Sequence, residues 1–429
     1  MSEKYKSILL TSMRSPYLDN DRVYPPLGLL YLKSYLDQYG IEVRIDDDFD
    51  FSSPEKYKGY DLFGASVMTP QRVISNEFLN FCKNNYNKDV VIGGPHALHY
   101  RKEVEEEGWN YIVCGDGFKS LLKIIKGTSN RVEVNSLTKK EWQELPRPDR
   151  SSDQAIRMLL GYNYNLGGVK ATTMLTSIGC PFRCRFCEEA QTTVKWSSIE
   201  NIIGELDDII NLGYKGVYIF DDLFITSLKK VKSICNELKK RGLVFRCNGH
   251  ARFFNDEFAQ ILKDSGCVEI AFGAESGSQK ILDNVEKQTE VKQNYKFVEL
   301  CNKYEIKCKA FIMLGLPGET YETIQETENF IKDSGIDDFQ LAVFMPYKGT
   351  KIREEIERGK DIGLYMNVEE VSGAYGVRGG ETVYEVFTKE LSSGELKKIR
   401  NDIVNRYRPK SHFSLPKDKF FETYGEKSL

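Results

Sequence analysis

The sequence lacks several features that would assign it to a broad class. No apolar run approaches the 18 or so consecutive residues that a membrane-spanning helix needs. Positive charge is not in excess, because 60 Lys and Arg face 63 Asp and Glu, so binding to nucleic acid through its phosphates is not expected. The first residues, MSEKYKSILLTSM, lack the basic head and apolar body of a signal peptide. We therefore expect a soluble, cytoplasmic protein without a membrane span.

Cysteine and histidine are scarce. Ten cysteines in 429 residues are too few for a disulfide scaffold, and four histidines do not suggest a histidine-based metal site. Three of the cysteines nevertheless lie close together, at Cys180, Cys184 and Cys187. In a reducing compartment, a cluster of this kind indicates metal or redox chemistry.

The N-terminal part alternates between two patterns. The chain is longer than one hydrophobic core usually supports, which predicts two or three domains. From residue 6 to about 126, short apolar runs such as SILLTS and YIVCG alternate with helical patterns such as PLGLLYLKSYLDQYG. This predicts an α/β fold with a Rossmann-like, doubly wound parallel sheet in residues 1–128. Ligands of such sheets bind at the carboxyl ends of the strands, here the loops around Thr69, Gly93 to His96, and Gly115 to Gly117.

Three further regions follow. Residues 129–170 are polar, contain two prolines and show no sustained period, so we interpret them as a linker. Residues 171–345 predict a partial (β/α)6 barrel whose active site lies at the carboxyl ends of its strands. The predicted strands are ATTMLTSI, KGVYIF, LVFRCN, VEIAFG, KCKAFIML and DFQLAVF. Residues 346–429 predict a small, α-rich C-terminal region on the substrate side.

Three interpretations of the cysteine cluster are open. The thiols could be buried hydrophobes, as most free cysteines are. They could form a structural zinc site, which normally needs a fourth ligand that is not found nearby in the sequence. Three thiolates without a fourth suit a cubane iron–sulfur cluster in which one iron is left open to an outside ligand. The cluster follows the first predicted barrel strand, where catalytic residues are expected.

The pattern C-x3-C-x-aromatic-C, formed by Cys180, Cys184, Phe186 and Cys187, resembles the radical S-adenosylmethionine (radical SAM) enzymes. The resemblance implies that the three cysteines ligate a 4Fe-4S cluster. It also implies that the open iron chelates S-adenosylmethionine and that one-electron reduction cleaves this cofactor to a 5'-deoxyadenosyl radical. Phe186 would then pack beside the adenine.

Four later motifs end successive predicted strands: FDD at 220–222, GHAR at 249–252, GAESGS at 273–278 and MLGLPGET at 313–320. Carboxylates there suit an ammonium group or a ribose, and glycines allow a flat ligand to approach the backbone. Each motif is also compatible with a simple turn or helix cap. The residues proposed for S-adenosylmethionine, from the resemblance and from this placement, are Phe186, Asp222, Arg252, Glu275, Ser276, Gly315 and Leu316.

The N-terminal motifs narrow the resemblance. VYPPLGLLYLKSYL, SVMTPQ, VIGGPH and VCGDG look like the cobalamin-binding domain of one radical SAM branch, and LPRPDR looks like its linker. The motif D-x-H-x-x-G, which supplies a histidine to cobalt, is absent, and the usual GEGE is GDGF here. The alternative is a domain that only shapes the substrate cleft. The residues proposed for cobalamin, if it is bound, are Thr69, Gly93, Gly94, His96, Gly115 and Asp116.

The leading functional hypothesis is a cobalamin-dependent radical SAM methyltransferase that acts on an unactivated carbon. A second hypothesis keeps the radical step but drops methyl transfer, so that the substrate radical undergoes cyclisation, rearrangement, epimerisation or carbon–carbon coupling. A third is a metal-stabilised interaction module without activity. We expect a small-molecule or peptide substrate and a one-electron reductant such as flavodoxin or ferredoxin, while the sequence identifies no catalytic side chain.

Overall fold

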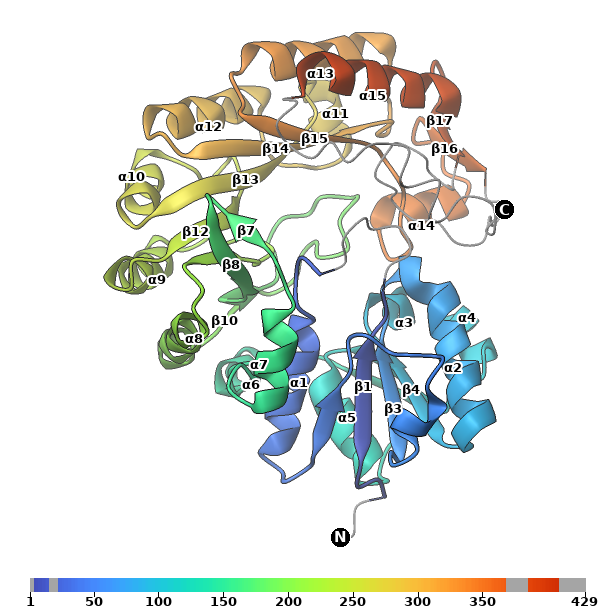
Figure 1. Ribbon diagram of the computed structural model, residues 1–429. Helices are drawn as coiled ribbons and strands as arrows, with labels where there is room; N and C mark the ends of the chain where they lie inside the picture. Colours follow the sequence, from blue (N-terminus) through green and yellow to red (C-terminus); the bar gives the residue numbers. More distant parts are fainter. Residues whose placement is uncertain (1–3, 15–21, 368–384, 409–429) are drawn as a thin grey trace.

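The computed structural model describes residues 4–14, 22–367 and 385–408. Two separate parallel sheets dominate it, one in the N-terminal part of the chain and one in the central part (Figure 1). The segment between them and the C-terminal helices pack against these sheets. None of the helices in the described ranges is long and apolar enough to cross a lipid bilayer.

The N-terminal sheet has six parallel strands in the order β2-β1-β3-β4-β5-β6. The strands are β1 (Ile8–Ser12), β2 (Val43–Ile45), β3 (Leu62–Ser66), β4 (Asp89–Gly93), β5 (Tyr111–Gly115) and β6 (Val132–Asn135). The helices and 3-10 turns between them are α1 (Leu27–Asp37), η1 (Pro54–Tyr57), η2 (Thr69–Gln71), α2 (Arg72–Tyr86), α3 (Pro95–His99), α4 (Arg101–Glu106) and α5 (Gly117–Ile125).

Both faces of this sheet are covered, because side chains alternate between the two faces along each strand. On β1, Ile8 and Leu10 enter the core beneath α1 and α5, whereas Leu9 enters the core beneath α2. Figure 1 shows these helices on opposite sides of the sheet. The doubly wound arrangement predicted from the alternating sequence is therefore confirmed.

The predicted linker has more structure than its polar composition indicated. Strand β6 lies within residues 129–170 and extends the N-terminal sheet by pairing with β5. The same region contains α6 (Lys139–Glu144), α7 (Asp153–Leu160) and β7 (Asn165–Leu166). Trp142 and Leu159 pack into the core beneath α1. The boundary at residue 128 thus separates β6 from the sheet to which it is hydrogen-bonded.

The central sheet has the order β15-β14-β13-β12-β11-β8-β7, with six parallel strands and the short antiparallel β7 at its edge. The sheet curls into a partial barrel whose helices lie on the outer side (Figure 1). Its strands are β8 (Val169–Met174), β11 (Gly216–Ile219), β12 (Val244–Gly249), β13 (Cys267–Glu275), β14 (Lys307–Leu314) and β15 (Asp338–Val343). Its helices are α8 (Ile199–Asn211), α9 (Leu228–Lys240), α10 (Asp256–Asp264), α11 (Gln279–Asn284), α12 (Val291–Lys303) and α13 (Tyr321–Asp333). The predicted partial barrel of six parallel strands is confirmed.

The C-terminal region is helical in part. It contains α14 (Lys351–Glu357) and α15 (Ser393–Tyr407), and α15 packs beside β15 and α13. It also contains an antiparallel pair, β16 (Leu364–Asn367) and β17 (Glu385–Thr388), which the sequence did not predict. The parts of this region at 368–384 and 409–429 lie outside the described residues.

A buried ion pair joins the linker to the barrel. The guanidinium of Arg150 donates to the carboxylate of Glu205 on α8 at 2.8 and 3.0 Å, and the two side chains are 0% and 2% exposed. Arg150 also donates to the carbonyl of Thr173 on β8, and the hydroxyl of Tyr31 on α1 donates to Glu205 at 3.5 Å. The pair of Arg150 and Glu205 therefore connects the linker, the barrel and α1 of the N-terminal domain.

We expect Arg150→Met to lower the free energy of unfolding by about 3–5 kcal/mol, because it leaves the Glu205 charge buried and unpaired. Arg147→Met is the matched control, since Arg147 pairs with Asp208 on the same helix but is 46% exposed, and it should cost about 1 kcal/mol or less. Urea unfolding measures both. Equal losses in the two variants would contradict the argument, and Arg150→Met combined with Glu205→Leu should regain most of the loss.

Candidate functional site

The three clustered cysteines lie on a loop, residues 179–194, whose ends are held together. The loop connects β9 (Ser177–Ile178) to β10 (Lys195–Trp196), and these strands pair antiparallel. Gly179 has φ +91°, and a Cβ there would meet the carbonyl oxygen of Thr193 at 2.5 Å, so glycine is required at this entry. The Gly179 N–H donates to Asp222 at 2.6 Å, which ties the loop to the end of β11. We call residues 179–194 the cysteine loop.

The thiols share an apolar environment. Cys184 is buried with Phe182 and Leu223, and Cys180 and Cys187 pack against this group. Burial raises the pKa of Cys180, raises that of Cys184 to about 11 and raises that of Cys187 to about 12. Neutral thiols are therefore the stable form in the protein alone, and a bound cation would be needed to stabilise the thiolates.

The donor set fits an iron–sulfur cluster better than a single ion. Across the described ranges, no group of three or more His, Cys, Asp or Glu side chains is arranged to hold one metal ion, so the zinc alternative has no support there. A zinc ion draws its four ligands to about 2.3 Å from one point. Cysteine thiolates are the usual ligands of iron–sulfur clusters, and one loop supplies three of them, from Cys180, Cys184 and Cys187.

A buried ion pair lies next to these thiols. Lys287 donates to Glu275 at 2.7 Å, and the two side chains are 8% and 9% exposed. Glu275 has φ +60°, a left-handed conformation that is unusual for glutamate, at a register shift near the end of β13. A Cβ on Gly273 would meet the Glu275 carboxylate at 2.0 Å and the Lys287 ammonium at 2.8 Å. The pair can therefore occupy this position because residue 273 is glycine.

Lys287 was missed by the sequence argument. Burial opposes its charge, but the carboxylate of Glu275, together with the negative charge of Cys184 and Cys187 when they are ionised, outweighs that effect and raises its pKa. Its ammonium also lies 5.8 Å from the ring centre of Phe186. Nothing in the sequence around Lys287 distinguishes it from the other lysines of the chain. Only its burial in the folded protein does so. The site thus contains a fixed positive charge that suits bound thiolates or a ligand carboxylate.

The loop after β14 contains Gly315 and Leu316 and is held from inside. The Glu319 carboxylate accepts the N–H groups of Gly315 at 3.0 Å and Leu316 at 3.4 Å, and its other oxygen accepts the hydroxyl of Thr323 at 2.7 Å. Glu319 is 2% exposed, and burial raises its pKa to about 7. The sequence did not predict a role for Glu319, yet its carboxyl group shapes the loop of Gly315 and Leu316, which were predicted to contact S-adenosylmethionine.

The remaining residues predicted for S-adenosylmethionine divide into accessible and buried ones. Asp222 and Arg252 are accessible, and Phe186 is half-buried. Ser276 is 1% exposed, and its hydroxyl already contacts Thr327 at 2.9 Å and accepts the N–H of Ser278 at 3.0 Å. The side chain of Ser276 is therefore occupied within the protein, so its role in binding a ligand stays a prediction.

His250 belongs to the same wall. Its ring stacks on Phe182 of the cysteine loop at 3.7 Å with an interplanar angle of 6°. Burial lowers its pKa to about 2, so the imidazole is neutral. Its Nδ1 accepts the N–H of Arg252 at 3.3 Å. The packing assigns His250 a supporting role beneath the loop.

The carboxyl edge of the N-terminal sheet carries the residues proposed for cobalamin. Gly94 and Gly115 both have φ +91°, and a Cβ on either would strike a neighbouring backbone oxygen, at 2.7 and 2.3 Å respectively. Both glycines are therefore needed by the fold itself. Asp116 accepts the N–H of Leu137 at 2.6 Å. His96 is 1% exposed and stacks on Tyr100, so its imidazole is not open to a ligand.

The accessible surface at this edge nevertheless fits a large, flat ligand. Thr69 and Gly93 are partly accessible, Gly115 is exposed, and Met68 and Leu98 are 58% and 44% exposed. Exposed apolar side chains beside open backbone suit the face of a broad ring. The residues present are therefore compatible with cobalamin, without an imidazole from His96.

Direct contacts join this edge to the cysteine loop. The imidazole of His99, at the end of α3, lies 3.0 Å from the carboxylate of Glu188, the residue after Cys187. Lys195, at the other end of the loop, lies 3.9 Å from Asp116. The carboxyl edge of the N-terminal sheet thus faces the cysteines, and a ligand held at either place would lie near the other.

Residues 174–331 match the radical SAM superfamily. An uncharacterized methyltransferase of Pyrococcus horikoshii is 29% identical over 77% of this chain and 78% of its own. The anaerobic magnesium-protoporphyrin IX monomethyl ester cyclase of Cereibacter sphaeroides is 25% identical over 90% of this chain and 66% of its own. The solved structure of the radical S-adenosylmethionine methyltransferase TsrM from Kitasatospora setae has a TM-score of 0.69 at 19% identity and covers 85% of this chain and 78% of that one.

The raised pKa of Glu319 predicts a specific dependence of stability on pH. Because the folded-state pKa of about 7 exceeds the ordinary 4.5, the stabilising contribution is complete below pH 4.5 and is lost as pH rises through about 7. Glu319→Gln keeps the acceptor for Gly315 and Leu316 but cannot ionise. Relative to this variant, the wild type should lose about 1.4 kcal/mol per unit of pKa shift across that window. Denaturant unfolding at several pH values measures the difference, and a constant difference would refute the assignment.

Proposed function

The chain belongs to the radical SAM superfamily, and from this premise we propose that it is a cobalamin-dependent radical SAM methyltransferase. The observation that carries the proposal is the arrangement of three clustered thiols, one buried and two partly buried, on the loop that follows the first barrel strand and faces the carboxyl edge of a Rossmann-like sheet. A substrate between these two surfaces would be within reach of cofactors held on both.

Named residues would hold each cofactor. Cys180, Cys184 and Cys187 would ligate a 4Fe-4S cluster. Lys287 and Glu275 offer charges of both signs to the carboxylate and ammonium groups of S-adenosylmethionine. The open backbone around Thr69, Gly93 and Gly115 would receive cobalamin. When bound, the cluster would supply the electron that cleaves S-adenosylmethionine to a 5'-deoxyadenosyl radical, and cobalamin would carry the methyl group.

The protein's own contribution is orientation and the exclusion of water. Glu319 fixes the backbone of Gly315 and Leu316, so this wall of the site is shaped before a ligand arrives. Phe182 and Leu223 surround Cys184 with apolar surface. A reactive carbon radical needs such an enclosed environment, because other hydrogen-atom donors, such as nearby C–H and S–H groups, would quench it.

The comparisons support this proposal. The Pyrococcus horikoshii relative is named a methyltransferase, and the TsrM structure is described with cobalamin and a [4Fe-4S] cluster bound. We propose that this protein acts in the cytoplasm on a small molecule or peptide and takes its electron from a flavodoxin or ferredoxin. The Cereibacter sphaeroides relative is named a cyclase, which favours radical ring formation as the second candidate.

Product analysis of the anaerobically reconstituted protein separates these functions. A methyltransferase should form both S-adenosylhomocysteine and 5'-deoxyadenosine and should co-purify with a corrinoid, whereas the second candidate forms 5'-deoxyadenosine alone. Cys184→Ala should lose most of its iron and reduce cleavage of S-adenosylmethionine at least about 100-fold, because a cluster ligand is removed. Cys82→Ala, a buried cysteine in the N-terminal domain, should match the wild type. Cleavage by Cys184→Ala at the wild-type rate would refute the proposal.

A further inference from the structure

The cysteine loop is contacted from outside the barrel at Arg185, the residue after Cys184. The backbone N–H of Arg185 donates to the carbonyl of Val285 at 3.0 Å, and its carbonyl accepts the N–H of Ile352 at 3.1 Å. Val285 follows α11, whereas Ile352 lies in the first turn of α14. A C-terminal helix is therefore hydrogen-bonded to the backbone of the loop that carries the thiols.

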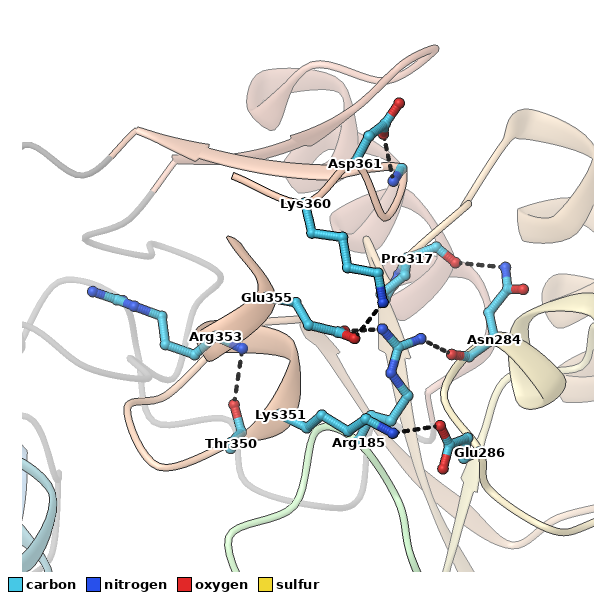
Figure 2. Close-up of polar contacts among 11 residues, drawn as sticks. Arg185, Asn284, Glu286, Pro317, Thr350, Lys351, Arg353, Glu355, Lys360 and Asp361 are labelled. Atoms are coloured by element: carbon cyan, nitrogen blue, oxygen red, sulfur yellow. Dashed lines mark hydrogen bonds and ion pairs between the residues drawn. The ribbon is translucent and has the colours of Figure 1, made fainter. Parts of the chain in front are cut away.

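The side chain of Arg185 strengthens this connection (Figure 2). Its guanidinium donates to the carbonyl of Asn284 and to the carboxylate of Glu355 on α14. Arg185 and Glu355 have side chains that are 12% and 11% exposed. Asn284 in turn donates from its amide to the carbonyl of Pro317 at 2.9 Å. One guanidinium thus connects the cysteine loop, the end of α11 and α14, with an extension to the loop after β14.

The surrounding charges are more exposed than this central pair. Lys360 donates to Glu355 at 2.7 Å but is 60% exposed, and Lys351 pairs with Glu286 at 2.7 Å with exposures of 54% and 42% (Figure 2). Solvent screens such pairs, so they add little. The pair of Arg185 and Glu355 is the shielded one, and its loss would leave a mostly buried guanidinium without a carboxylate partner, held only by the carbonyl of Asn284.

Arginine suits position 185 because two acceptors lie in different directions from its side chain, the carbonyl of Asn284 and the carboxylate of Glu355. A guanidinium presents several donors in a rigid plane and can bind Asn284 and Glu355 together. A lysine would keep the charge, but its single ammonium cannot reproduce the fork. The geometry therefore depends on both the charge of Glu355 and the shape of Arg185.

We propose that Glu355 is a positioning residue for the iron–sulfur cluster: through Arg185 it fixes the stretch of the cysteine loop between Cys184 and Cys187, and so controls the environment of the cluster. This rests on the proposed function, since it requires a cluster on the three thiols. It also assigns a role to the start of the C-terminal region that differs from lining a substrate pocket.

The test compares Glu355→Gln with Glu354→Gln in the full-length, anaerobically reconstituted protein. Glu354 is the next residue on the same helix and pairs with Arg358 on the surface, with exposures of 52% and 75%. Both variants remove one carboxylate charge from α14 and one pair with an exposed cation, Lys360 or Arg358, so the difference between them is the contact with Arg185.

Electron paramagnetic resonance of the reduced cluster, with and without S-adenosylmethionine, is the main readout, and a redox titration gives the midpoint potential. For Glu355→Gln we expect an altered spectrum, a weakened response to S-adenosylmethionine, a shifted potential and cleavage slowed about tenfold. Glu354→Gln should match the wild type in all four. A spectrum and potential of Glu355→Gln identical to those of the wild type would overturn the proposal.

Two further variants keep the test decisive if Glu355→Gln folds poorly. Arg185→Lys retains the charge and should reproduce the altered spectrum, whereas Glu355→Asp retains the carboxylate and should recover part of the wild-type signal. An unaltered spectrum in Arg185→Lys would overturn the proposal. If the wild type itself forms no cluster and does not cleave S-adenosylmethionine, the proposed function fails, which is a separate result.

Discussion

The rest of the structure depends on one constraint: three clustered thiols, one buried and two partly buried, must be held in place on a loop that has no regular secondary structure of its own. The backbone of such a loop lacks the partners that a helix or sheet would supply, so its polar groups must find them elsewhere. Asp222 and Thr192 accept the N–H groups of Gly179 and Cys180, at 2.6 and 2.8 Å, near the start of the loop. Farther along, Gln288 accepts the N–H of Arg183 at 3.2 Å. Thr192 belongs to the loop itself, whereas Asp222 and Gln288 lie far from it in the sequence, so the order of the loop depends in part on distant elements.

The charges of Lys287 and Glu275, next to the thiols, are better explained by a role in binding than by a contribution to folding stability. A buried ion pair such as Lys287 and Glu275 gains little net free energy, because removing both charges from water costs about as much as their attraction returns. The pair also requires that Glu275 adopts the left-handed backbone conformation and that residue 273 is glycine. A chain under selection for stability alone would fill this space with apolar side chains. Its presence beside Cys184 and Cys187 is therefore consistent with a role for the charges themselves in binding.

The features that could be predicted from the sequence are those that depend on the pattern of residues in a short segment. Both sheets were visible as alternating apolar and helical runs, and the helix expected over PLGLLYLKSYLDQYG is α1, Leu27–Asp37. The cysteine motif was equally local. Strand β6 was missed because four alternating residues within a polar stretch give a weak signal.

The other omissions have a different cause. Lys287, Arg185 and Glu355 lie in segments rich in charge, where a single Lys, Arg or Glu is unremarkable in the sequence. Their distinction is burial beside partners that are up to 170 residues away, as for Arg185 and Glu355. Because such contacts arise from the packing of separate elements, no reading of a local segment can identify them.

The start of the C-terminal region connects the two sheets and so helps to fix their position relative to each other. Just before α14, Lys348 pairs with Glu103 of α4 and lies 4.7 Å from the ring centre of Tyr100, so it contacts the N-terminal domain. A few residues later, Glu355 contacts the cysteine loop. The segment from 348 to 355 is therefore attached at one end to the domain proposed for cobalamin and at the other to the loop proposed for the iron–sulfur cluster. Two cofactors that must act on one substrate need a constant separation, and a short helical segment attached to both sides supplies it more rigidly than a flexible linker could.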